Sequence, residues 1–121
     1  MPRATRVTEP QLDVAACLLR AHFQGEQPHG WAIMKATKRS GPTVYQVLDR
    51  FEDRGWIEGS WEELDSTSNR PRRRFYRLTS EGLAGVQDLL TERRPEALEE
   101  TRNPGQGIRL PSRWSTAPDG A

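Results

Sequence analysis

The sequence predicts a mainly helical α+β domain, with three helices, then a two-stranded hairpin, then a further helix. Three observations support this class. Apolar residues recur at helical spacing in four stretches between residues 9 and 94, and two short stretches of alternating polarity lie between the last two of these. Proline and helix-capping side chains stand where the helices are expected to begin. A chain of 121 residues is long enough for one such domain with a modest core.

The first helix is predicted over about residues 9–24. Thr8 and Gln11 fit a capping box, and Pro10 lies in the first turn, where its missing N–H costs little. Gly25 is a suitable left-handed terminator. The apolar positions that recur at helical spacing are Leu12, Ala15, Ala16, Leu19 and Phe23.

A second, shorter helix opens at His29–Gly30 and ends near Lys38–Arg39. The third is predicted over residues 42–54, capped by Ser40 or Gly41, and it ends at Gly55. Its core-facing positions are Val44, Val47, Leu48 and Phe51. Its other side carries Thr43, Tyr45, Gln46, Asp49 and Arg50. The third helix therefore has one buried face and one polar face available to a partner.

Alternating polarity predicts a hairpin after the third helix. Residues 56–62 form the first strand, residues 63–71 a polar loop with turn formers, and residues 72–78 the second strand. The residues expected on the apolar side of each strand are Ile57 and Trp61 in the first and Tyr76 and Leu78 in the second. Three helices followed by such a hairpin make a winged helix-turn-helix, with the wing over residues 62–74.

The chain divides into four parts. We expect a flexible N-terminus over residues 1–7, the winged-helix domain over 8–78, a C-terminal helix over 79–102 and a disordered tail over 103–121. Pro95 interrupts the C-terminal helix, and one or two helical turns follow it. The tryptophans expected in the core are Trp31, Trp56 and Trp61.

Composition narrows the classes of function. The net charge of +1 is almost neutral, so nucleic-acid binding must rest on an uneven distribution of charge. Arginines concentrate over residues 70–77, whereas residues 81–100 are mostly acidic. Cys17 is the single cysteine, which excludes an intrachain disulfide and a cysteine-rich zinc site, and its apolar neighbours predict a small buried side chain. No signal peptide or membrane-length apolar run is visible, and we expect a cytoplasmic protein.

Four motifs in order resemble the PadR-type transcriptional regulators of bacteria. These are HGW at 29–31, SGPTVY at 40–45, RFEDRGWIEGSWE at 50–62 and NRPRRRFYRLTSEG at 69–82. The resemblance covers about residues 8–94, and the single clear C-terminal helix is similar to the short subfamily. It implies a dimeric winged helix-turn-helix that usually represses transcription. The dimer contact would be made by Leu83, Val86, Leu89 and Leu90 after the wing, with Leu12 and Leu19 of the first helix.

Together, the polar face of the third helix and the resemblance predict a surface that binds double-stranded DNA. We expect the bound DNA to be an inverted-repeat operator. In the recognition helix, side chains near base edges or phosphates are Ser40, Thr43, Tyr45, Gln46, Asp49 and Arg50, and a second basic group is Lys38 with Arg39. In the wing, the predicted contacts to phosphate or the minor groove are Arg70, Arg72, Arg73 and Arg74. Two alternatives stay open: a merely solvated polar face, and arginines paired with Glu58, Glu62 or Glu63 across the hairpin.

Other functions have weaker support. His22 and His29 lack flanking carboxylates at ligand spacing, and His29 is expected to cap the second helix or to bond locally. Because no phosphate loop, nucleophile elbow or catalytic carboxylate pair is visible, we expect no enzyme, cofactor or metal. A small-molecule effector is unsupported, since no tryptophan falls in the dimerisation segment. The rival is a protein-binding winged-helix module, favoured by the acidic residues Glu52, Asp53 and Glu58 near the recognition helix.

Overall fold

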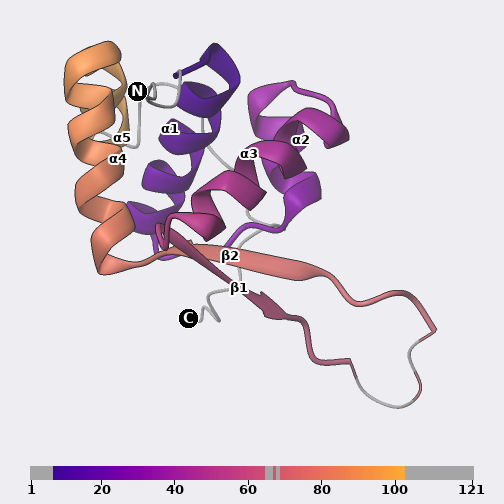
Figure 1. Cartoon of the computed structure of the whole chain (residues 1–121). Coiled ribbons are helices and arrows are strands. Elements are labelled where there is room, and N and C mark those ends of the chain that lie inside the picture. Colours follow the sequence, from indigo (N-terminus) through magenta and orange to yellow (C-terminus); the bar gives the residue numbers. More distant parts are fainter. Residues whose placement is uncertain (1–6, 65–66, 68, 103–121) are drawn as a thin grey trace.

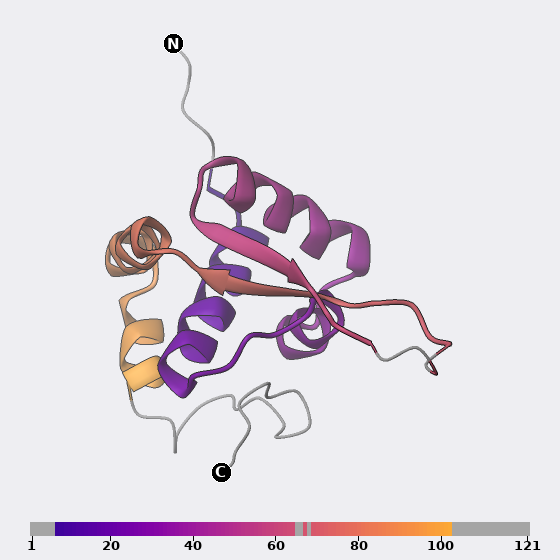
Figure 2. The ribbon, with the colours of Figure 1, turned by 90° about the horizontal axis from the view of Figure 1, so that it is seen from below.

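The computed structural model describes residues 7–64, 67 and 69–102, so the predicted tail 103–121 and nearly all of the predicted flexible N-terminus lie outside the described residues. Seven elements follow one another: α1 (Glu9–Gln24), α2 (Gly30–Thr37), α3 (Gly41–Asp53), β1 (Ile57–Trp61), β2 (Arg74–Leu78), α4 (Ser80–Arg93) and α5 (Pro95–Arg102). Helix α1 lies in the middle, with α4 and α5 on one side and α2 and α3 on the other (Figure 1). The hairpin crosses one end of this body and projects beyond it (Figures 1 and 2).

Side-chain caps explain where the helices begin. Thr8 accepts a hydrogen bond from the N–H of Gln11 at the start of α1, and Ser40 accepts one from the N–H of Thr43 at the start of α3. The predicted first helix is confirmed at both ends, with Gly25 left-handed after it at a φ of 73°. The predicted third helix begins one residue earlier than expected, because Ser40 is the cap.

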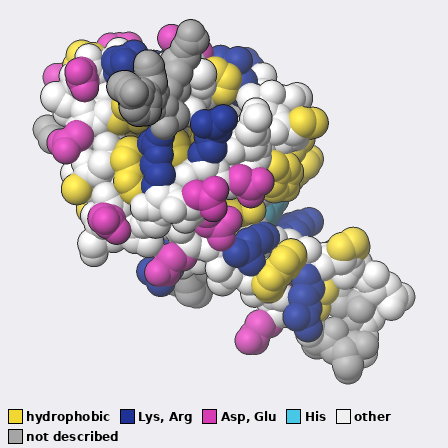
Figure 3. Space-filling view, viewed as in Figure 1, with side chains coloured by type: hydrophobic (Ala, Val, Ile, Leu, Met, Phe, Trp, Pro, Cys, Tyr) yellow, Lys and Arg dark blue, Asp and Glu magenta, His cyan; other side chains and the backbone are white. Residues whose placement is uncertain are grey.

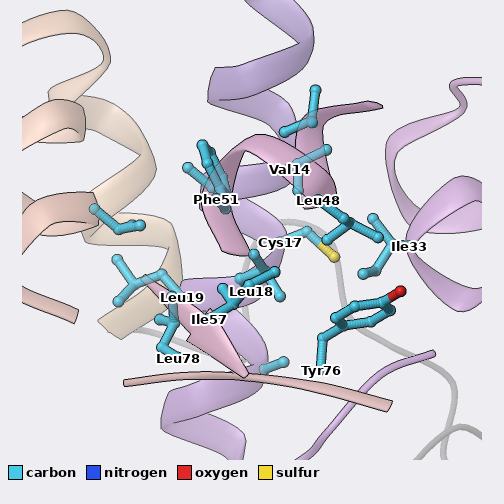
Figure 4. Packing of buried hydrophobic residues seen from close by; sticks show 14 of the residues in the cluster. Val14, Cys17, Leu18, Leu19, Ile33, Leu48, Phe51, Ile57, Tyr76 and Leu78 are labelled. Atoms are coloured by element: carbon cyan, nitrogen blue, oxygen red, sulfur yellow. The ribbon is translucent and has the colours of Figure 1, made fainter. Parts of the chain in front are cut away.

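The core gathers around α1. Figure 4 shows Val14 and Leu18 of α1 among side chains from α2, α3 and the hairpin. The four residues predicted on the buried side of α3 are buried, and so are Ile57 of β1 and Tyr76 and Leu78 of β2. Burying a side chain of this size contributes about 1.5–3 kcal/mol, so this cluster supplies most of the driving force that fixes α3 against α1.

Two tryptophans expected in the core lie at the surface. Trp31 is 45% exposed and Trp61 is 59% exposed, so their assignment to the core is wrong. Trp61 ends β1 beyond the helices that cover Ile57, and Trp31 lies in the first turn of α2. Phe23 in the last turn of α1 is also exposed. Trp56 alone of the three predicted core tryptophans is partly covered, with its ring 5.4 Å from that of Phe51.

The C-terminal segment forms two helices, with the break at Pro95 that the sequence predicts. Arg94 leaves the helical region, at φ −152° and ψ 65°, and α5 starts at Pro95. The Arg94 guanidinium bonds to Asp13 of α1 at 2.7 Å and to Glu9. Because Val86, Leu90 and Ala97 belong to the same buried cluster as α1, residues 79–102 share one core with the winged helix. None of the described helices has the length and apolar character to span a membrane.

The packing of α4 against the hairpin predicts a strict requirement for glycine at position 82. A Cβ there would lie 1.8 Å from the carbonyl oxygen of Trp56, so Gly82→Ala must push α4 away from β1. We expect a loss of about 1–3 kcal/mol in the free energy of unfolding, measured by chemical denaturation. Gly41→Ala is the control, since its Cβ would meet only Met34 at an ordinary 3.5 Å. Equal stability of the two variants would contradict this packing.

Candidate nucleic-acid interface

Helix α3 presents one continuous polar stripe to solvent. Tyr45, Gln46, Asp49 and Arg50 are exposed, and Thr43 is half-buried at the edge of the stripe. At 100° per residue, Gln46 and Asp49 lie at its centre, with Arg50 on the side of α1 and Tyr45 on the other flank. The hydroxyl of Ser40 is occupied by the cap, because it accepts from the Thr43 N–H and donates to the Thr43 hydroxyl at 3.1 Å.

A groove of about 290 Å³ joins the flank of α3 to the hairpin. Tyr45 reaches it over Gly30, where a Cβ would lie 2.1 Å from the tyrosine hydroxyl oxygen, so only glycine leaves room for this ring. The residues that line it are His29, Gly30, Trp31, Tyr45, Trp61, Arg72, Arg73, Arg74 and Tyr76. Aromatic and cationic side chains therefore lie side by side in this groove next to α3. Such a groove suits a polyanion that contains rings, because the cations attract its negative charges and the aromatic side chains can pack against its rings.

Most hairpin arginines have carboxylate partners. Arg70 makes two bonds to Glu62, at 2.8 and 2.7 Å, and these bonds lower the pKa of the Glu62 carboxyl to about 2. Arg77 bonds to Glu58, directly across the strands, at 2.6 Å. The alternative that arginines pair across the hairpin is thus confirmed for these two. Within the described ranges, Arg72 and Arg73 make no ion pair and are exposed.

Arg74 connects the hairpin to α3. It pairs with Trp61 in the strand register, and its guanidinium lies over that indole at 5.2 Å. The same guanidinium donates to Glu52 of α3 at 2.9 Å. Gly59 provides the space, since a Cβ there would lie 2.5 Å from the Arg74 Nε. The side chain predicted to contact DNA therefore fixes the angle between the hairpin and α3.

The second predicted basic group divides between solvent and the protein. Lys38 is exposed and ends α2 in the left-handed conformation, at a φ of 60°. Arg39 instead donates to the Asp13 carboxylate at 2.8 Å from both its Nε and Nη2 atoms. Because Arg94 bonds to the other oxygen of Asp13, this carboxylate holds the α2–α3 turn and the start of α5 to α1. Figure 3 shows Lys and Arg side chains beside hydrophobic ones along the projecting hairpin.

The residues predicted to make the dimer contact lie mostly within one chain. Leu12, Leu19, Val86 and Leu90 are at most 5% exposed, because α1 and α4 pack against each other. Leu83 and Leu89 are half-buried at the edge of the same cluster. Of the six leucine and valine residues predicted to make the contact, these two leucines alone offer apolar surface to a second chain.

His29 caps α2, as expected. Its Nδ1 accepts a hydrogen bond from the N–H of Ala32 at 3.3 Å, and the ring is packed edge-on against Phe75 at 5.7 Å. Burial lowers the pKa of His29, and the nearby positive charges of Arg73 and Arg70 lower it further, against a weaker opposing effect of Glu62. The imidazole is therefore neutral at pH 7 and serves as an acceptor rather than as a cation.

Residues 21–88 match the model of the Transcriptional regulator PadR-like family. The chain belongs to this family. The match covers the motifs from α2 to α4 that carry the resemblance, and therefore includes the polar stripe and the groove beside it. A search of curated protein sequences finds no match to the chain.

Solved structures with the same fold include the protein AF1382 and the winged-helix regulators MepR and ZitR. AF1382 of Archaeoglobus fulgidus is 19% identical, with a TM-score of 0.57 over 70% of this chain and 85% of that one. The Staphylococcus aureus MepR–DNA complex is 23% identical, with a TM-score of 0.57 over 84% and 67%. Lactococcus lactis ZitR, a zinc-responsive MarR family member, is 16% identical, with a TM-score of 0.55 over 85% and 64%. At these identities the likeness shows the fold.

Trp31 and Trp61 lie beside the wing arginines in the groove, an arrangement that the sequence pattern does not predict. One signal was available for Trp61, because it lies four residues after the buried Ile57 on a strand that must extend past the helical body to form a wing. No comparable signal marks Trp31, which periodicity assigned to the core.

The neutral cap predicts a loss of stability in acid. The unfolded chain takes up the His29 proton near its ordinary pKa of 6.5 and the folded chain only at lower pH, so stability falls as pH drops below 6.5. We expect denaturation curves at about pH 7.5 and about pH 5.5 to show this loss, and to show less of it in His29→Asn, which keeps a capping acceptor. Replacing the exposed His22 by Asn should leave it unchanged. An undiminished loss in His29→Asn would rule out this origin.

The contacts of Arg74 predict a stability difference between neighbouring arginines. Arg74→Ala removes the bond to Glu52 and the stack on Trp61, and should lower the free energy of unfolding by about 1 kcal/mol. Arg72→Ala is the matched control and should stay within about 0.5 kcal/mol of the wild type, because Arg72 is exposed. Thermal or urea unfolding measures both. Equal losses would show that Arg74 does not tie the hairpin to α3.

Proposed function

We propose that this PadR-like chain binds double-stranded DNA in a sequence-specific way and represses transcription as a homodimer. The observation that carries the proposal is the continuity between the polar stripe of α3 and the groove that contains Arg72 and Arg73. The guanidinium groups of these two arginines form no ion pair in the described residues, and they lie beside a helix whose outer face is polar. A duplex supplies base edges and phosphates at that spacing.

The proposed division of roles follows from the geometry of the stripe. Gln46 and Arg50, on the outer face of α3, would reach base edges in the major groove, where Gln suits adenine and Arg suits guanine. Arg72 and Arg73 would contact the phosphate backbone or the minor groove, with Tyr45 and Lys38 on adjacent phosphates. Arg70 and Arg74 would act on DNA indirectly, by shaping the hairpin through Glu62 and Glu52. MepR, which has this fold, is solved as a complex with DNA, and this supports DNA binding but not a particular orientation.

The proposed dimer would use the half-buried Leu83 and Leu89 of α4, because the other predicted contact residues are buried where α1 and α4 pack against each other. Sedimentation of the full chain with and without duplex tests the oligomeric state. An operator selected as an inverted repeat, with half-sites about one helical turn apart, would support two copies per site. Selection of a single half-site by a monomer would contradict the dimer and leave DNA binding intact.

Selection from a random duplex pool at two salt concentrations tests DNA binding itself. We expect Arg72→Ala and Arg73→Ala to weaken binding to all sequences and to reduce the salt slope by about one each. Gln46→Ala and Arg50→Ala should instead change the selected sequence, at a cost of about 1–3 kcal/mol for the preferred site. Arg77→Ala, which removes an arginine paired with Glu58 near the base of the hairpin, should leave both properties unchanged.

Two outcomes would overturn the proposal. Equal effects of Arg72→Ala and Arg77→Ala would mean that only total charge matters, and the groove would have no special role. No enrichment and no salt-sensitive binding would exclude the DNA surface altogether. The rival, a winged-helix module that binds protein through its acidic residues, would then be favoured.

A further inference from the structure

Trp61 is the most exposed large hydrophobic side chain of the described residues, with 59% of its surface accessible. A single exposed apolar side chain needs no explanation. Here, however, Trp31 and Tyr45 line the same groove and are also exposed, and of the large hydrophobic residues exposed in the described part of the chain Phe23 alone lies elsewhere. The exposed aromatic surface is therefore gathered in one place, which indicates a contact with a partner.

The indole of Trp61 is held in place by its own hairpin. The guanidinium of Arg74, its partner in the strand register, lies over the ring at 5.2 Å. That guanidinium is itself fixed, because it donates to Glu52 of α3 at 2.9 Å. A side chain that is ordered before binding loses little rotamer freedom on contact. Trp61 therefore offers a preformed apolar surface beside α3.

The charges around this groove select a polyanion as the partner. Among the described residues, its lining contains three arginines and no carboxylate. Arg74 is paired with Glu52, whereas the guanidinium groups of Arg72 and Arg73 form no ion pair in the described residues. The partner must therefore carry anionic groups for the arginines and an apolar part for Trp61. One strand of DNA meets both requirements, because its phosphates alternate with deoxyribose rings.

The place of the groove decides which part of a duplex lies in it. This step rests on the proposed function, in which α3 lies in the major groove and the hairpin reaches the neighbouring minor groove. The strand that separates these two grooves then passes between α3 and the hairpin, where Tyr45 and Trp61 line one groove. That strand presents its sugars and phosphates to the protein, while its bases are paired inside the duplex. Trp61 therefore meets a sugar and not a base.

We propose that Trp61 packs against the deoxyribose of one nucleotide where the strand crosses this groove, and that it discriminates against a 2′-hydroxyl at that nucleotide. The indole covers the sugar face that includes C2′, while Arg72 and Arg73 bond phosphates of the same strand. A ribose would place its hydroxyl against ring carbons, where it loses water and gains no acceptor. Trp61 is thus a residue that determines specificity for the sugar and reads no base.

Salt dependence separates the indole from the arginines around it. On the duplex that the full chain selects, Trp61→Ala should weaken binding about tenfold with the salt slope and the selected sequence unchanged, because it removes apolar surface and no charge. Trp61→Phe should recover part of this loss. Phe23→Ala is the matched control, since it removes an exposed ring that lies outside the groove, and it should bind like the wild type. Wild-type affinity of Trp61→Ala would overturn the proposal, as would a salt slope reduced as in Arg72→Ala.

Replacing one deoxynucleotide of the duplex at a time by a ribonucleotide locates the sugar. We expect a position outside the base pairs read by Gln46 and Arg50 at which the ribonucleotide weakens wild-type binding about five- to tenfold, and has little effect on Trp61→Ala. A 2′-fluoro nucleotide there, which favours the ribose pucker but has no hydroxyl, should bind nearly as well as the deoxynucleotide. If Trp61→Ala does not fold, Trp61→Phe replaces it and should show a reduced effect.

The outcomes of this scan separate the present inference from the proposed function. No position that is sensitive to a ribonucleotide, equal sensitivity in the wild type and in Trp61→Ala, or equal losses with the 2′-fluoro nucleotide would each overturn the role of Trp61. In those cases salt-sensitive, sequence-specific binding of the wild type to the duplex would still support the proposed function. A wild-type chain without such binding would overturn both.

Discussion

The burial of α1 on most of its sides is the constraint on which the rest of the structure depends. This helix contacts all four other helices and β2, so its side chains form the centre of the single core. A helix covered from several directions leaves its neighbours with their outer faces exposed. Helices α2 and α3, with the polar stripe, lie on one side of α1 and α4 with α5 on the other, while the hairpin crosses the end of α1 (Figure 1). Two surfaces of different chemistry are therefore built on opposite sides of one helix.

Strand register distributes charge along the hairpin. Near the body, Glu58 lies opposite Arg77, and farther out Trp61 lies opposite Arg74, whose charge is turned toward Glu52. These pairs neutralise the base of the hairpin. Beyond the end of β2, the Glu62 carboxylate accepts from the backbone N–H of Arg73 and pairs with Arg70, whereas the guanidinium groups of Arg72 and Arg73 form no ion pair in the described residues. The cationic surface thus arises because some hairpin arginines are paired with carboxylates and others are not. A chain with a net charge of only +1 can therefore still present positive charge on its hairpin.

The sequence predicts those features that depend on local periodicity and capping. The buried and exposed sides of α3, the caps at Thr8 and His29 and the order of elements could all be read from residue spacing. Spacing says which residues share a face, but it does not say how far the neighbouring elements extend to cover that face. Trp61 is exposed for this reason. Ion pairs such as Arg70–Glu62 depend on strand register, and the burial of Arg20 depends on how α5 packs against α1 after the predicted break at Pro95. No local pattern specifies these contacts.

The shared carboxylate of Asp13 has a consequence for how mutations combine. One oxygen bonds Arg39 at the turn before α3, and the other bonds Arg94 at the start of α5, so residues distant in the sequence depend on one acceptor. Loss of either arginine leaves the carboxylate to the other, whereas loss of Asp13 removes a bonded acceptor from both. The effects of Arg39 and Arg94 should therefore be non-additive, and sequence change at one end of the chain constrains what the other end can tolerate.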